Sequence, residues 1–309
     1  MLKIKEGKIT RPLKAVFYGP EGVGKSTLAA QCPEPLFIDT EGGTDQLEVR
    51  RVEPPGTWNE LIATVSEAAR DPDVCRTLVI DTIDWAEQLA VRHVCIKNVV
   101  NSIEAIPYGK GYVYVADEMG RFLTACDAVI ASGKNVVILA HAKMRKQELP
   151  DEAGSFDRWE LKLSRHAAPL VKEWSDLLLF LNFQTYVVTT DSGSHKAQGG
   201  KRVMFTSHHP CWDGKNRAGL PDKLDMDYGA IEPLFAGGKA EPRPIDTLRA
   251  KMADAGVTAG QVQAVVAART QKYDADMPIG DYDPAFIRDW CIPHFDKIVN
   301  MIKEENDNG

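Results

Sequence analysis

The sequence predicts an α/β fold with a mostly parallel central sheet and a small helical C-terminal domain. Short apolar runs alternate with helical segments up to about residue 180, as in strands joined by right-handed helical crossovers. The run at 76–82 is apolar without alternation, which is typical of a strand buried on both faces. A Gly- and Pro-rich stretch follows the core. We therefore expect domains at 1–235 and 245–309, joined by a linker at 236–244.

Each element is expected from a local pattern. The apolar stretch at 14–19 ends in glycine, and Thr57 is placed to cap the helix that follows it. Long polar segments inside a compact domain are usually functional or disordered. We expect strands at 14–19, 35–40, 76–82, 135–141, 176–191 and 201–207, helices at 24–32, 57–70, 84–100 and 117–132, and irregular segments at 101–118 and 142–166.

Composition excludes several classes of protein. The chain has 309 residues, of which 44% are hydrophobic, and no apolar run approaches the roughly 20 residues that a membrane helix needs. The N-terminus lacks the apolar segment of a secretory signal. Six cysteines are scattered without a C-x-x-C pair, which favours reduced thiols in a cytoplasm. The cluster His208–Cys211 could bind a metal, but a loop at a strand end explains it as well.

The net charge of −7 gives no global support to nucleic-acid binding. Any such site must be a local basic patch.

The stretch "GPEGVGKST" matches G-x-x-x-x-G-K-[ST] after an expected strand and before an expected helix, the context that the motif requires. In such a loop the backbone amides surround the β-phosphate, Lys25 bridges the β- and γ-phosphates, and Ser26 ligates Mg²⁺. We therefore expect ATP and Mg²⁺ as ligands. The nucleotide-binding residues are expected to be Gly19, Pro20, Glu21, Gly22, Val23, Gly24, Lys25, Ser26 and Thr27.

Asp81 ends the apolar strand "LVID", where a carboxylate can hold magnesium through water. It could instead cap the next helix. Two further carboxylates, Asp39 and Glu41, end the second strand in "FIDTEGG". Hydrolysis requires a group that orients water, and a strand-end carboxylate can supply it.

At this point the sequence resembles the RecA-like recombinases, whose corresponding strand ends Ile-Asp-x-Glu. The resemblance implies that Glu41 activates water, with Lys25 as the other catalytic residue, although a solvated turn is the alternative for Glu41. It also implies that His141 senses the γ-phosphate, unless it is simply a strand-end histidine. The Lys-x-Arg pair Lys215 and Arg217 resembles the cations that reach the nucleotide of a neighbouring subunit, unless it is a basic surface turn.

In that family, two loops bind single-stranded DNA, and position assigns them to 101–118 and 143–166 here. Basic residues with interleaved aromatics suit phosphate contact and base stacking, although acidic residues dilute the second segment and a solvated charged loop is the alternative. The expected DNA-binding residues are Lys110, Tyr112, Lys143, Arg145, Lys146, Arg158 and Lys162.

The ordered set "GPEGVGKSTLA", "LFIDTEGG", "LVIDTIDW", "VVILAHAK" and "DGKNRAGLP" resembles phage-encoded RecA-like ATP-binding proteins of the single-strand annealing type, which are core-only recombinases. The resemblance implies a RecA-like P-loop NTPase core and a DNA-dependent ATPase that promotes annealing or strand exchange in the host cytoplasm. It implies single-stranded DNA, a ring or filament of identical subunits and a single-strand-binding protein as partners. The alternatives are a replicative-type helicase or loader ATPase, and a nucleotide-switched binding module with little turnover.

Overall fold

The structure is a computed structural model that describes residues 7, 11–148, 154–189, 195–236, 244–270 and 272–307, without the side chains of 186–189, 195–198 and 304–307. The chain divides into two compact units, residues 1–239 and residues 240–309. Most of the predicted linker at 236–244 lies outside the described residues.

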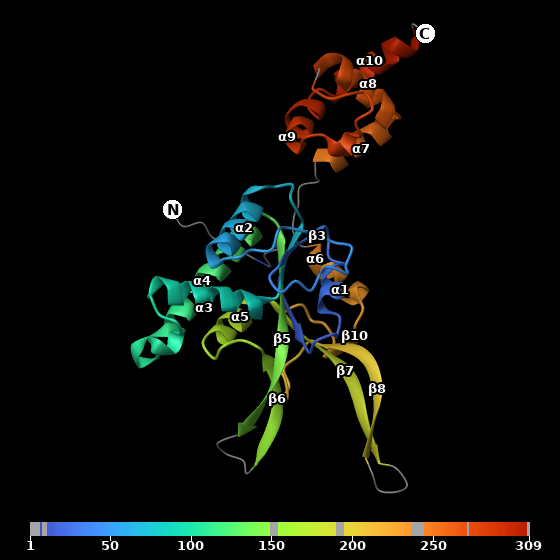
Figure 1. The fold of residues 1–309 in the computed structure, drawn as a ribbon. Helices are drawn as coiled ribbons and strands as arrows, with labels where there is room; N and C mark the ends of the chain where they lie inside the picture. Colours follow the sequence, from blue (N-terminus) through green and yellow to red (C-terminus); the bar gives the residue numbers. More distant parts are fainter. Residues whose placement is uncertain are drawn as a thin grey trace. The chain divides into compact units, whose positions relative to one another are not determined.

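The first unit is built on one large sheet (Figure 1). Its main path runs β10-β8-β7-β1-β5-β4-β2-β3, while β6 pairs with β5 and β9 with β7. The six strands from β7 to β3 are parallel, and β6, β8, β9 and β10 pair antiparallel with their neighbours. The strands are β1 (Lys14–Gly19), β2 (Pro35–Asp39), β3 (Arg50–Arg51), β4 (Thr77–Asp81), β5 (Asn135–Glu148), β6 (Ser155–Leu161), β7 (Leu177–Thr189), β8 (His195–Phe205), β9 (Lys215–Asn216) and β10 (Lys223–Asp225).

Both faces of the sheet are covered by helices. Alternate residues of each parallel strand point to opposite sides, and both sets are apolar here. In β1, Val16 and Tyr18 join the core under α2–α5, while Ala15 and Phe17 join the core under α1 and α6. The predicted N-cap Thr57 is confirmed, since it forms a capping box with Glu60. The helices are α1 (Lys25–Ala29), α2 (Trp58–Arg70), α3 (Ile83–Lys97), α4 (Lys110–Ala131), α5 (Ala167–Trp174) and α6 (Glu232–Phe235), with 3₁₀ turns at Ile103–Ala105, Pro107–Gly109 and Tyr228–Ala230.

The prediction of an irregular segment at 101–118 is wrong in its second half, where α4 already begins at Lys110. Gly111 indicated a loop in the sequence, but here it allows close packing. A Cβ atom on Gly111 would lie 2.3 Å from the backbone oxygen of Ile103. The helix can therefore start seven residues earlier than the expected start at 117.

The prediction of a long loop at 142–166 is also wrong, except for its last residues, 162–166. Strand β5 continues to Glu148 and pairs antiparallel with β6, from Ala142 opposite Leu161 to Glu148 opposite Ser155. The segment is a hairpin whose tip, 149–153, lies outside the described residues. The alternation of Trp159, Leu161 and Leu163 is the period-two signal of a strand, and many neighbouring charges obscured it.

The second unit is helical and has its own apolar core, formed by residues such as Leu248, Val266, Ile287 and Ile298. Its elements are α7 (Pro244–Ala255), α8 (Ala259–Thr270), a 3₁₀ turn at Ile279–Asp281, α9 (Pro284–Phe286), a π-helical turn at Ile287–Cys291 and α10 (Phe295–Asp307). The predicted fold class, a mostly parallel α/β core with a helical C-terminal domain, is confirmed.

No helix in the described part of the chain is long and apolar enough to cross a membrane. All six cysteines are unpaired, and five of them are buried. In the His208–Cys211 segment, the His209 ring accepts a hydrogen bond from the Cys211 amide and stacks on Trp212.

Candidate functional site

The phosphate loop joins β1 to α1 at one edge of the sheet. Gly24 has a φ of 103°, a left-handed conformation that favours glycine, and the helix begins at the next residue. Lys25 is buried, and its Nζ donates to the backbone oxygens of Gly19 at 3.3 Å and Pro20 at 3.1 Å. Burial lowers the pKa of Lys25, although the nearby carboxylates of Asp81 and Glu41 oppose that shift.

Asp81 ends β4, which is separated from β1 by β5. Its Oδ2 accepts a hydrogen bond of 2.6 Å from the Ser26 hydroxyl at the start of α1. Burial raises the pKa of Asp81 to about 6, and the Ser26 hydrogen bond and the Lys25 charge only partly oppose this rise. The buried carboxylate has a lysine and a hydroxyl beside it, which suits a site completed by a cation.

These residues fit a nucleotide with Mg²⁺. Magnesium prefers hard oxygen ligands and is usually bound by one or two protein groups together with phosphate oxygens and water. The Ser26 hydroxyl and the Asp81 carboxylate provide two such oxygens next to the phosphate loop, at the carboxyl ends of the strands. In the described part of the chain, no cluster of three His, Cys, Asp or Glu side chains could hold a metal. A magnesium ion here would take its remaining ligands from phosphate oxygens and water.

Asp39 and Glu41, the two carboxylates of "FIDTEGG", have different roles. β2 ends at Asp39, whose buried carboxylate accepts bonds from the amides of Glu41, Gly42 and Thr44 and from the Thr44 hydroxyl. Burial would raise the pKa of Asp39, but these hydrogen bonds hold it below its ordinary value. Asp39 therefore shapes the turn that carries Glu41.

Glu41 lies beside the residue that follows β4 and beside a residue in the middle of β5. Its Oε2 accepts a hydrogen bond of 3.2 Å from the Thr82 hydroxyl, directly after Asp81, and its Oε1 lies 3.8 Å from Nε2 of His141. The Glu41 side chain is 30% exposed, so water can reach it. The structure thus brings together four predicted residues, namely Lys25, Glu41, Asp81 and His141.

Asp84 is a site residue that sequence analysis missed. It lies in the first turn of α3. Its Oδ1 accepts a hydrogen bond of 3.0 Å from the His141 backbone amide, and its Oδ2 lies 2.8 Å from Nδ1 of the His141 ring. Burial opposes ionisation of Asp84, but the His141 hydrogen bonds outweigh it and hold its pKa below the ordinary value. Nδ1 is thus hydrogen-bonded to Asp84, and the other ring nitrogen, Nε2, faces Glu41. A helical Asp three residues after Asp81 could have been noticed, but nothing in the sequence pairs it with His141.

Lys215 and Arg217 lie at the opposite end of the strands from the phosphate loop. β9 pairs with Leu177 and Leu178 at the start of β7, and these residues pair with the start of β1. The Lys215 Nζ donates to two backbone oxygens in the last turn of α5, those of Lys172 and Glu173. A contact with a neighbouring subunit is not tested by a single chain and stays a prediction.

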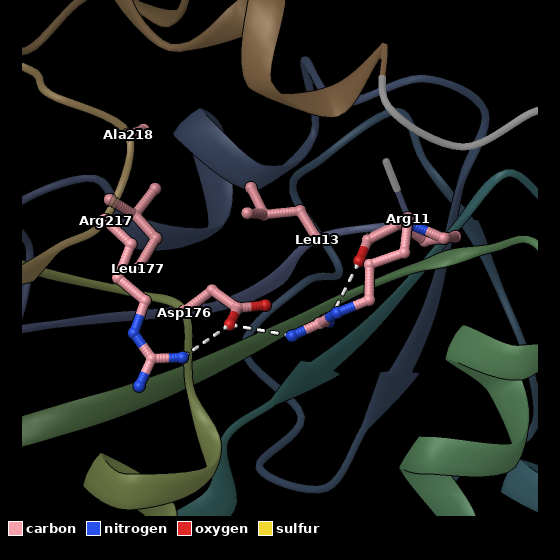
Figure 2. Close-up of a pocket in the computed structure, with 7 residues that line it drawn as sticks. Arg11, Leu13, Asp176, Leu177, Arg217 and Ala218 are labelled. Carbon is pink, nitrogen blue, oxygen red and sulfur yellow. Dashed lines mark hydrogen bonds and ion pairs between the residues drawn. The ribbon is translucent and has the colours of Figure 1, made fainter. Parts of the chain in front are cut away.

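Arg217 shares an acceptor with Arg11. Figure 2 shows both guanidinium groups converging on Asp176, at 3.2 Å for Arg217 and 2.8 Å for Arg11. The Arg217 side chain is 64% exposed, so it remains accessible despite this ion pair.

The seven predicted DNA-binding residues divide into two groups. Arg158 is buried and donates to the backbone oxygens of His209 and Pro210 and to the carboxylate of Asp213, so its role in this structure is internal. The Lys143 Nζ donates to the backbone oxygen of Leu163 at 2.6 Å. The others are exposed or half-buried: Lys110, Tyr112, Arg145, Lys146 and Lys162.

The two predicted DNA-binding segments meet in the fold. The Tyr112 ring, near the start of α4, stacks with the ring of His166, just after the β5–β6 hairpin, at a centroid distance of 6.2 Å. Arg145 and Lys146 lie on the outer part of β5, and the Arg145 guanidinium is 3.9 Å from the Glu160 carboxylate.

The fold and the phosphate site define a P-loop NTPase. A family model described as an AAA domain matches residues 11–218, more than half of the sequence, and the chain belongs to this family.

Among solved structures, a KaiC-like protein of Pyrococcus horikoshii is 13% identical, with 64% of this chain and 80% of that chain covered and a TM-score of 0.37. The flagellar accessory protein FlaH of Methanocaldococcus jannaschii is 11% identical, with 70% and 85% covered and a TM-score of 0.34. A search of curated proteins found no match.

Asp81→Asn is expected to stabilise the nucleotide-free protein at pH 8. The folded-state pKa of about 6 lies above the ordinary value of 3.8, so the unfolding free energy falls as pH rises between these values. Removing the buried charge should therefore add about 1–3 kcal/mol, measured by urea unfolding. At pH 3, where the carboxyl is protonated in both states, the gain should vanish. A variant less stable than wild type at pH 8 would contradict the buried-charge account.

Proposed function

We propose that this protein hydrolyses ATP in the presence of Mg²⁺ and that hydrolysis is coupled to single-stranded DNA. The observation that supports the hydrolase part is the position of Glu41, which is held by Thr82 and His141 near the Asp81 and Lys25 side chains. A partly exposed carboxylate beside a phosphate loop is placed to orient a water molecule toward a bound terminal phosphate.

In this proposal, each residue of the site has a separate task. The loop amides and Lys25 hold the phosphates, and Ser26 with Asp81 holds the metal ion, which when bound neutralises phosphate charge. Glu41 accepts a hydrogen bond from the attacking water. His141 is fixed by Asp84 and keeps the Glu41 carboxylate in place. The arrangement supports turnover over the alternative of a nucleotide-switched module with little hydrolysis.

The proposed DNA surface consists of the start of α4 and the β5–β6 hairpin, with Lys110, Tyr112, Arg145, Lys146 and Lys162 as its contacts. Support comes from the Tyr112–His166 ring contact, which joins two segments distant in the sequence, and from the exposure of the basic residues. Aromatic rings next to flexible cations suit an unpaired strand. Annealing or strand exchange, in an oligomer of this chain, is the activity that we propose for this surface.

Glu41→Gln is expected to retain ATP binding and to lose hydrolysis by at least about a hundredfold, because the amide cannot accept the proton of the water. Lys25→Ala should instead abolish ATP binding, because it removes the cation that contacts the phosphates. Equilibrium binding and steady-state phosphate release measure the two effects. If the Glu41→Gln protein turns over ATP at the wild-type rate, Glu41 is not the activating group.

Reversing two exposed charges, as in Arg145→Glu with Lys146→Glu, should weaken single-stranded DNA binding. The slope of log K against log salt should flatten by about 1.4, since each lost phosphate contact removes about 0.7. Arg50→Glu with Arg70→Glu is the matched control, because both arginines are exposed and lie outside the hairpin, on α2 and on β3, which is separated from β5 by two strands. Equal slopes for the two double variants would place the DNA site elsewhere.

Arg217→Ala tests the contribution of a neighbouring subunit. If Arg217 leaves Asp176 to reach a neighbour's nucleotide, ATP hydrolysis should fall by about tenfold or more while nucleotide affinity changes little. Arg11→Ala, which removes the other partner of Asp176, is the control for local disruption. Normal turnover by the Arg217→Ala protein would exclude the intersubunit contact.

A further inference from the structure

Arg202 lies on β8, opposite Phe183 of β7, and sequence analysis gave it no role. Its guanidinium carbon lies 6.0 Å from the centre of the Phe183 ring, within the range of a cation–π contact. β7 is also the neighbour of β1, the strand that leads into the phosphate loop. The Phe183 ring therefore contacts the arginine, whose strand β8 is separated from β1 by β7 alone.

The guanidinium of Arg202 reaches the phosphate loop itself. A Cβ atom built on Gly24 would lie 3.2 Å from Nη1 of Arg202 and 3.1 Å from Cε of Met226. Gly24 directly precedes Lys25, so the arginine ends beside the part of the loop that surrounds the β-phosphate in such sites. Because Gly24 has no side chain, nothing of its own lies between the loop backbone and the guanidinium.

Arg202 forms no ion pair with a carboxylate in the described part of the chain. Its neighbour Lys201 differs, because it pairs with Asp225 at 2.7 Å. A guanidinium group is always charged, is weakly hydrated and forms strong paired hydrogen bonds with phosphate. Two features thus coincide at Gly24: an arginine that pairs with no carboxylate of the described residues, and a loop of a type that binds phosphate.

We propose that Arg202 contacts the phosphate chain of a nucleotide bound in its own subunit. This inference rests on the proposed function, because it assumes that the loop binds ATP. Arg202 is distinct from Lys215 and Arg217, which lie at the other end of the strands and were predicted to act on a neighbour. A lysine from the loop and an arginine from β8 then flank the phosphates, and only the folded sheet brings them together.

The test compares Arg202→Ala with Lys201→Ala in the full chain. Dissociation constants for ADP and for a non-hydrolysable ATP analogue with Mg²⁺ are measured by calorimetry. Loss of one charge-assisted contact should raise both constants for Arg202→Ala by about tenfold to a hundredfold. Lys201→Ala removes the same charge from an exposed neighbour and should stay within twofold of wild type. Arg202→Gln, measured alongside, retains most of the side-chain length and should show the same loss.

The outcomes separate this inference from the proposed function. Affinities within twofold of wild type for both Arg202 variants would overturn the contact while leaving ATP binding intact. An equal loss in Lys201→Ala would also overturn it, because a general effect of surface charge would then explain the result. If the wild-type protein binds neither nucleotide, the proposed function fails and the inference fails with it.

Discussion

The hydrogen bond between Ser26 and Asp81 joins the two halves of the site. It connects the helix after β1 to the end of β4, although β5 lies between these strands. In a parallel sheet, all carboxyl ends meet at one edge, so residues from β1, β2, β4 and β5 converge there. The hydrogen bond favours the charged form of Asp81, but burial disfavours it more, and the pKa of Asp81 is therefore raised. A nucleotide and a metal ion would offset the cost of that burial.

Three carboxylates near this edge differ because their hydrogen bonds differ. Asp39 is satisfied by backbone amides and Thr44, so it shapes a turn. Asp84 is satisfied by His141, so it fixes a ring. Glu41 accepts one bond from Thr82 and remains partly exposed, which leaves it free to meet water. Residue type alone cannot distinguish a structural carboxylate from a reactive one; the number of donors around it can.

The basic side chains also differ in how many of their hydrogen bonds are formed within the chain itself. Arg158, Lys143 and Lys215 were expected to bind DNA or a neighbour's nucleotide, yet each donates to backbone oxygens of its own chain. Arg145 and Lys146 remain exposed, and Arg202 was not expected to be functional at all. A basic side chain whose donors are already used within the fold is less available to a partner, and how many are used depends on contacts between distant segments.

The sequence by itself determined the parallel core, the phosphate loop with Lys25 and Ser26, and Asp81 at a strand end, because these follow from local periodicity and from a motif of fixed spacing. It also placed Glu41 just after the second strand, whereas His141, expected at a strand end, lies within β5, which continues to Glu148. Only the tertiary structure decided that strands β5 and β6 form a hairpin within 142–161, that Asp84 orients His141 and that Arg202 reaches Gly24. Each of these depends on strand register or on packing between elements far apart in the chain, and neither quantity leaves a local pattern in the sequence.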